Sequence, residues 1–169
     1  FAFDQHINIG NNANEIIEQM IDGISNFNDE LVSPEELEDW VAKKISSVDP
    51  VKDIEEYDLV HRLDNLCRMY KEYVKFKSGI DAMDYDDLIV KSYKLLSDSN
   101  YSHILHRMQK KFRYILVDEF QDNNFAQFSL VEKIAKDGNI TAVGDPDQNI
   151  YRFQGAYTQI FEHFRKAFP

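Results

Sequence analysis

Residues 114–119 read Tyr-Ile-Leu-Val-Asp-Glu, a short apolar run that ends in two adjacent carboxylates. Such a run is typical of a strand buried on both faces of a parallel sheet. A second apolar run, residues 140–143, ends in a glycine and Asp145, and the segment between the two runs, about 124–136, has helical periodicity. A strand, a helix and a strand joined by short loops predict a parallel βαβ unit.

The segments around this unit are predicted to be helical. Ser33 with Glu36, and Asp84 with Asp87, have the spacing of helix caps. We expect Leu88 to point inward from the helix that follows Asp84. Helical spacing of apolar residues occurs over residues 14–27, 34–45, 54–77, 85–97, 101–111 and about 156–167. The predicted fold class is therefore α/β, with an all-helical subdomain over residues 1–82 and a parallel sheet with flanking helices over residues 83–169.

The charge of the chain is distributed unevenly. The net charge of −11 argues against a protein that binds nucleic acid through bulk electrostatics. Residues 1–60 hold fifteen acidic against three basic residues, which gives −12, and residues 61–169 hold fifteen against sixteen, which gives +1. A basic cluster in the second part either faces phosphates or is simply a solvated face; its members are Arg107, Lys110, Lys111 and Arg113.

Targeting and redox signals are few. The single cysteine, Cys67, excludes an intrachain disulfide, fits a reducing compartment and lies on the apolar stripe of its predicted helix. No apolar run approaches the roughly 20 residues of a membrane span, and no signal peptide is visible. We therefore expect a cytoplasmic protein. His103 and His106 have no partner at metal-site spacing, so a surface or packing role is expected for them.

The polar residues after the two predicted strands could carry chemistry. Ligands bind at the carboxyl ends of parallel strands, where Asp118 would suit Mg²⁺ and Glu119 could polarise an attacking water. The competing interpretation is an acidic helix start that the helix dipole favours. After the second strand, Gln148 could bond a terminal phosphate, or could belong to a turn rich in Asp and Pro. Tyr151 and Phe153 could stack on single-stranded bases, or could be core residues.

Two stretches together resemble a known family. Asp118-Glu119-Phe120-Gln121-Asp122 and the later run from Val143 to Ala156, Val-Gly-Asp-Pro-Asp-Gln-Asn-Ile-Tyr-Arg-Phe-Gln-Gly-Ala, resemble motifs II and III of the UvrD/Rep/PcrA family of superfamily 1 DNA helicases. Residues 83–89 are similar to the D-F-D-D-L-I segment of that family, and residues 23–36 to its helical insertion. The resemblance covers about residues 20–169. It implies helical subdomain 1B followed by part of a RecA-like (P-loop NTPase) motor domain, 1A.

The resemblance also implies a function. It would be that of an ATP-dependent DNA helicase or translocase in DNA repair, replication or recombination, with ATP and Mg²⁺ as cofactors and with single-stranded DNA and duplex DNA as the partners to be expected. Asp118 would bind Mg²⁺ through water, Glu119 would activate the hydrolytic water, and Gln148 would sense the γ-phosphate. The resemblance implies DNA binding for Tyr151, Phe153 and Arg152, and supporting places in the site for Gln121, Asp122, Asp145 and Gln154.

The sequence departs from the family pattern at several points. The phosphate loop G-x-x-x-x-G-K-T is absent, so we expect an internal excerpt of a longer helicase that is inactive alone. Gln154 stands where the family commonly has Arg. Two alternatives stay open: a non-catalytic UvrD-like DNA-binding or regulatory protein, and the motor part of a helicase–nuclease. Any duplex contact in the helical part is expected to use its basic residues, Arg62, Arg68, Lys71, Lys75 and Lys77.

Overall fold

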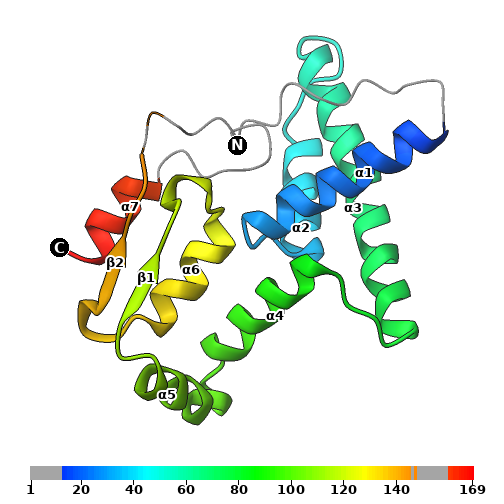
Figure 1. Cartoon of the computed structure of the whole chain (residues 1–169). Helices are drawn as coiled ribbons and strands as arrows, with labels where there is room; N and C mark the ends of the chain where they lie inside the picture. The colour runs from blue at the N-terminus through cyan, green and yellow to red at the C-terminus, as the bar shows by residue number, and fades with distance from the viewer. Residues whose placement is uncertain (1–12, 146, 148–159) are drawn as a thin grey trace. The chain divides into compact units, whose positions relative to one another are not determined.

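The computed structural model describes residues 13–145, 147 and 160–169. These residues are mostly helical and include a small parallel sheet (Figure 1). The chain divides into two compact units. Among the described residues, the first unit holds 13–27 and Val32–Met83, and the second holds Asn28–Leu31 and the described residues from Asp84 onward. Among the helices described, none is both long and apolar enough to cross a membrane.

The first unit is built from α1 (Ala13–Asp29), α2 (Pro34–Ile45) and α3 (Ile54–Gly79). The predicted capping box at the start of α2 is confirmed, because Glu36 N donates to Ser33 Oγ over 3.2 Å and Ser33 N donates to Glu36 Oε2 over 2.9 Å. The apolar faces of the three helices meet in one core, in which Cys67 is buried as predicted. Its buried members are Ile24, Phe27, Leu37, Val41, Val60, Leu63, Leu66, Cys67 and Tyr70.

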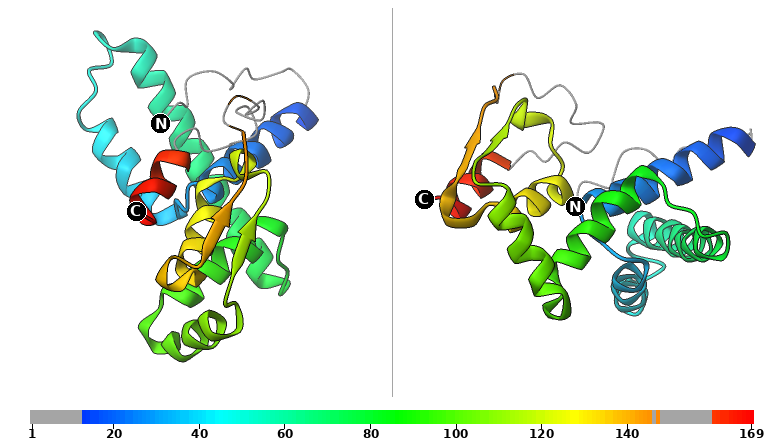
Figure 2. Two further views of the ribbon diagram at one scale, coloured as in Figure 1. Left: turned by 60° about the vertical axis from the view of Figure 1, so that its left-hand side comes forward. Right: turned by 60° about the horizontal axis from the view of Figure 1, so that its bottom comes forward.

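The second unit contains the predicted βαβ arrangement. Strands β1 (Ile115–Val117) and β2 (Ile140–Ala142) pair in parallel, with Leu116 opposite Thr141, and both views of Figure 2 show them side by side. The helix between them is α6 (Phe125–Ile134). Other described elements of this unit are α4 (Tyr85–Ser97), α5 (Ser102–Lys111), α7 (Ile160–Ala167) and the short 3-10 helices Ser99–Tyr101, Phe120–Asp122 and Lys136–Gly138.

Side-chain caps set the starts of α4 and α6. Asp87 N donates to Asp84 Oδ1 over 2.8 Å, which confirms the predicted cap of α4. Gln127 N donates to Asn124 Oδ1 over 2.8 Å at the start of α6. Each cap satisfies a backbone N–H that the first turn of a helix leaves unpaired.

The sheet is less buried than predicted. Phe120, Phe128 and Ile160 form a core with residues of α7 against Val117 and Ala142, so this core covers one face of the sheet. Leu116 points to the other face and is 79% exposed, because no described residue covers it. The prediction that β1 is buried on both faces is therefore wrong for the part of the chain that the structure describes. The prediction that Leu88 of α4 points inward is also wrong, because its exposed fraction is 48%.

Candidate active site

Asp118 and Glu119 follow β1 directly and are both exposed. Glu119 N donates to Asp118 Oδ1 over 3.0 Å. The backbone of Glu119 lies in the left-handed region, with φ 48° and ψ 47°. This conformation costs a non-glycine residue about 1–2 kcal/mol, and such outliers concentrate at functional sites. The turn therefore directs two adjacent carboxylates outward at the carboxyl end of the strand, where parallel sheets bind ligands.

The segment after β2 is held tightly against this turn. Val143 N donates to Val117 O over 2.8 Å, and Phe120 N donates to Val143 O over 2.9 Å. Gly144 comes next, and a Cβ added to it would lie 2.9 Å from Phe120 N and 3.1 Å from Phe120 Cβ. Contacts under 3.0 Å force atoms to move, so this close approach of two backbones requires glycine at position 144.

Gln121 connects the two strand ends through its side chain. It is only 2% exposed. Its Nε2 donates to Glu119 Oε2 over 2.6 Å, and its Oε1 accepts a hydrogen bond from Asp145 N over 3.0 Å. A carboxylate can only accept and a backbone N–H can only donate, so one amide satisfies both partners. The orientation of Glu119 and the path of the chain at Asp145 are thus coupled through one buried side chain.

Aromatic packing supports the turn from the core side. Phe120 is 1% exposed, and its ring meets three other rings edge-on. The distances between ring centroids are 6.0 Å to Phe128, 5.3 Å to Phe161 and 5.2 Å to Phe164. Each edge-to-face pair contributes about 0.5–1.5 kcal/mol beyond its buried area. The residue between Glu119 and Gln121 is therefore an anchor that limits movement of both.

A contact between residues distant in sequence fixes the start of α6. Asn124 Nδ2 donates to Asp29 Oδ1, 95 positions earlier in the chain. Burial first, and then the negative charges of Asp86 and Glu30, raise the pKa of Asp29 from 3.8 to about 7. Sequence reasoning missed this contact. The sequence predicted a helix that begins at about residue 124, but no local pattern pointed to Asp29.

The remaining predicted site residues divide into two groups. Asp122 is exposed at the end of the 3-10 helix, and Asp145 is partly buried. Asp145 Oδ1 also accepts a hydrogen bond from Asp147 N over 3.0 Å. The structure therefore brings Asp118, Glu119, Gln121 and Asp145 together at one edge of the sheet. The other predicted residues lie outside the described residues; these are Gln148, Tyr151, Arg152, Phe153 and Gln154.

The donor set of this edge suits a hard cation that keeps its waters. Asp118 and Glu119 supply exposed carboxylate oxygens, which Mg²⁺ prefers as one or two protein ligands beside water and phosphate oxygens. The described residues contain no group of three or more His, Cys, Asp or Glu side chains that could hold a metal. A Zn²⁺ site, which takes three or four such ligands, does not fit the described part of this edge.

The basic residues expected to contact duplex DNA are largely engaged with other side chains. Arg68 pairs with Asp64 over 2.6 Å, and Lys71 pairs with Glu38. Lys77 is buried, with its Nζ 4.4 Å from the centre of a tyrosine ring. A cation paired in this way offers less to a phosphate, because its partner must be displaced first. Duplex contact through α3 stays a prediction.

Comparison with known proteins gives consistent matches. A model of the family described as UvrD/REP helicase N-terminal domain matches residues 2–169. The chain is 40% identical over 105 residues to the ATP-dependent DNA helicase PcrA of Staphylococcus aureus, covering 62% of this chain and 14% of the relative. It is 39% identical over 103 residues to the ATP-dependent DNA helicase Rep of Buchnera aphidicola, covering 60% of this chain and 15% of the relative. The matched region thus spans about a seventh of the length of these relatives.

Proposed function

The chain belongs to the family of UvrD/REP helicase N-terminal domains, and on that premise we propose that it is a section of an ATP-dependent DNA motor. The family match confirms the resemblance predicted from the two motifs. In this proposal the helical unit corresponds to subdomain 1B, and the second unit forms part of a RecA-like domain, 1A. The whole protein couples ATP hydrolysis to movement along single-stranded DNA in repair, replication or recombination. The names of the relatives and the parallel βαβ unit support this assignment.

The observation that carries the proposal is the bridge made by Gln121. Its hydrogen bond uses one carboxylate oxygen of Glu119, and the second oxygen belongs to an exposed side chain that water can reach. A general base needs a fixed carboxylate within hydrogen-bond reach of the water that it activates. Glu119 is therefore proposed as the base, and Gln121 as the residue that positions it. Because Gln121 also accepts a hydrogen bond from Asp145 N, a shift of the turn after β2 would change the orientation of the Glu119 carboxylate.

Asp118 is proposed to hold Mg²⁺ through water. Its Oδ1 accepts the bond from Glu119 N, which orients the carboxylate. When bound beside ATP, Mg²⁺ neutralises charge on the phosphate oxygens. The protein contributes an outward carboxylate at the strand end, held next to the proposed base.

The residues after Asp147 are proposed to sense ATP and bind DNA. Gln148 would form a hydrogen bond with the γ-phosphate. This role is supported by its position in the sequence directly after Asp147, whose N–H donates a hydrogen bond to Asp145. Tyr151 and Phe153 would stack on bases, with Arg152 between them contacting the strand. Gln154 carries no charge, so a charge-dependent coupling role at this position is not proposed.

ATP hydrolysis is proposed to need parts that these 169 residues do not contain. No G-x-x-x-x-G-K-[ST] segment is present to surround the phosphates with backbone N–H groups and a lysine. Without such a loop the terminal phosphate is not positioned for attack, and positioning supplies much of the catalysis of phosphoryl transfer. The isolated chain should therefore not hydrolyse ATP, even with Glu119 and Asp118 in place.

DNA-stimulated ATP hydrolysis tests the proposal in two samples. The whole protein, expressed from its complete reading frame, should hydrolyse ATP faster when single-stranded DNA is added, and the 169-residue chain should show no hydrolysis. A whole protein that binds DNA without hydrolysing ATP would instead support a non-catalytic relative and contradict the motor. DNA-stimulated hydrolysis by the isolated chain would contradict the claim that the phosphate loop is required. Nuclease activity of the whole protein would indicate a motor joined to a nuclease.

A further inference from the structure

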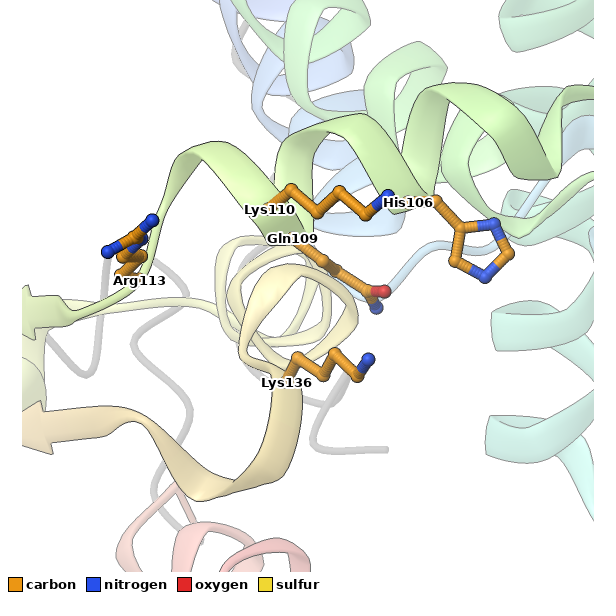
Figure 3. Close-up of a pocket in the computed structure, with 5 residues that line it drawn as sticks. All are labelled: His106, Gln109, Lys110, Arg113 and Lys136. Carbon is orange, nitrogen blue, oxygen red and sulfur yellow. The ribbon is translucent and has the colours of Figure 1, made fainter.

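A basic surface lies at the start of β1, whereas the candidate active site follows its end. Two adjoining hollows form this surface. One, of about 380 Å³, is shown in Figure 3 and is lined by His106, Gln109, Lys110, Arg113 and Lys136. The other, of about 480 Å³, is lined by His103, His106, Arg107 and Lys110. In Figure 3 the side chains of Gln109, Lys110 and Lys136 extend in the same direction, and Arg113 lies where the chain leads into β1.

The periodicity of α5 produces the basic face. His103, His106, Arg107 and Lys110 stand at positions i, i+3, i+4 and i+7, which places them on one side of the helix, and all four are exposed. The opposite side is partly buried through Ile104, Leu105 and Met108. Residues 99–117 contain four Lys or Arg residues and no Asp or Glu. This stretch therefore carries +4 in a chain whose net charge is −11.

The cations in the hollows differ from those described basic residues that are paired with a carboxylate. Lys71 of α3 is paired with Glu38, whereas no described carboxylate lies within ion-pair distance of Lys110, Arg113 or Lys136. Two neighbouring lysines have aromatic partners instead: Lys111 lies over Phe112, and Lys133 over Tyr93. The ends of α5 and α6 each carry about half a negative charge, which together offset only about one of these cations.

We propose that this surface binds the phosphate backbone of a single-stranded nucleic acid, as a DNA contact separate from the Asp118–Glu119 edge. The inference goes beyond the proposed motor chemistry and rests on it only for the choice of DNA. From His103 to Lys110 this face of α5 spans about 10 Å, so its hydrogen-bond donors can follow successive phosphates. A peptide partner would be expected to bury an apolar anchor, and apart from the imidazole rings of His103 and His106 no described residue that lines either hollow is aliphatic or aromatic. Contacts to phosphate oxygens, in contrast, require only hydrogen-bond donors such as the side chains of this surface.

The test compares two triple variants of the chain with equal loss of charge. One carries Lys110→Gln, Arg113→Gln and Lys136→Gln. The matched control carries Lys43→Gln, Lys52→Gln and Arg165→Gln, at exposed positions elsewhere. Binding of a fluorescent 20-mer of thymidine is followed by anisotropy over a series of salt concentrations. The loss of three phosphate contacts should reduce the magnitude of the negative slope of log K against log salt by about 2. Binding should weaken between about tenfold and a hundredfold at 0.1 M salt.

Several outcomes decide the inference. Equal affinity and slope for the two triple variants, both with the wild-type circular dichroism spectrum and melting temperature, would overturn it. Stronger competition by a 20-residue polyglutamate than by unlabelled DNA would identify an acidic peptide site instead. Competition by inorganic phosphate at the same concentration of phosphate groups would identify a free-phosphate site and also overturn it.

A further arm separates this inference from the motor proposal. The triple substitution of Lys110, Arg113 and Lys136 is repeated in a chain that also carries Tyr151→Ala and Phe153→Ala, which remove the two rings proposed to stack on DNA in the motor. The magnitude of the salt slope should still fall by about 2 when the three cations of the basic surface are removed. If replacing Tyr151 and Phe153 has no effect on DNA binding, that result would count against the motor proposal alone. A triple substitution of the basic surface without effect in this background would count against the basic surface alone.

Discussion

Replacing Gln121 with Met should destabilise the second unit more than the loss of an ordinary polar side chain. The side chain is 2% exposed and of similar length to methionine, so little volume changes. The charge-assisted bond to Glu119 Oε2, at 2.6 Å, is worth about 1.5–3 kcal/mol. The loss of the partner of Asp145 N costs about 1–3 kcal/mol more, toward the lower end because Asp145 is only partly buried. The thioether recovers about 1 kcal/mol by burial, which leaves a net loss of about 2–4 kcal/mol.

Gln109→Met is the matched control for this change. Gln109 is partly buried, and it makes one neutral hydrogen bond, from Nε2 to Lys133 O over 3.0 Å. Its loss should cost about 1 kcal/mol. The free energy of unfolding is measured in urea by circular dichroism, and the exchange of Asp145 N–H by NMR. In Gln121→Met that exchange should accelerate at least about tenfold. Equal costs for the two variants, with Asp145 N–H as protected as in the wild type, would refute the bridge.

Other predictions follow from the same contacts. Gly144→Ala should lower the free energy of unfolding by about 1–3 kcal/mol in a urea titration, because the new methyl group meets the backbone of Phe120; an unchanged midpoint would contradict the close approach. Burial, and then the charge of Asp86, raise the pKa of Asp29 to about 7 in the folded chain. As the pH rises, Asp29 therefore loses its proton in the unfolded chain before it does so in the folded chain, and the free energy of unfolding falls between about pH 4 and pH 7. Asp29→Asn should therefore match the wild type near pH 4 and exceed its stability by about 1–2 kcal/mol at pH 8, allowing for solvent screening; parallel pH profiles would contradict this. Ser33→Ala should cost about 1 kcal/mol in thermal unfolding by removing the cap of α2, with the exposed Ser46→Ala as a milder control.

Local features were predictable because their causes lie within a few residues. The cap of α2 needs only Ser33 and Glu36, three positions apart, and the cap of α4 needs only Asp84 and Asp87. The parallel pairing of β1 with β2 followed from two apolar runs joined by a helical segment. Each cap is set within one helical turn, and each strand is indicated by its own short continuous apolar run.

Features that depend on distant packing were not predictable. Whether Leu116 is buried depends on what covers the second face of the sheet, and its own run of sequence does not contain that information. The role of Gln121 was anticipated only as general support, because its partner Asp145 lies 24 positions away and meets it through strand register. The pairing of Asn124 with Asp29 spans 95 positions and has no local signal.

The most direct test of the central claim is ATP turnover by the whole protein carrying Glu119→Gln. The amide still has an oxygen that can accept from Gln121, so the turn should keep its shape, but it cannot take a proton from water. The account predicts that kcat for DNA-stimulated hydrolysis falls by about 10²–10⁴, while KM for ATP stays within about threefold. A variant that retains more than about a third of the wild-type kcat would contradict the assignment of Glu119 as the base.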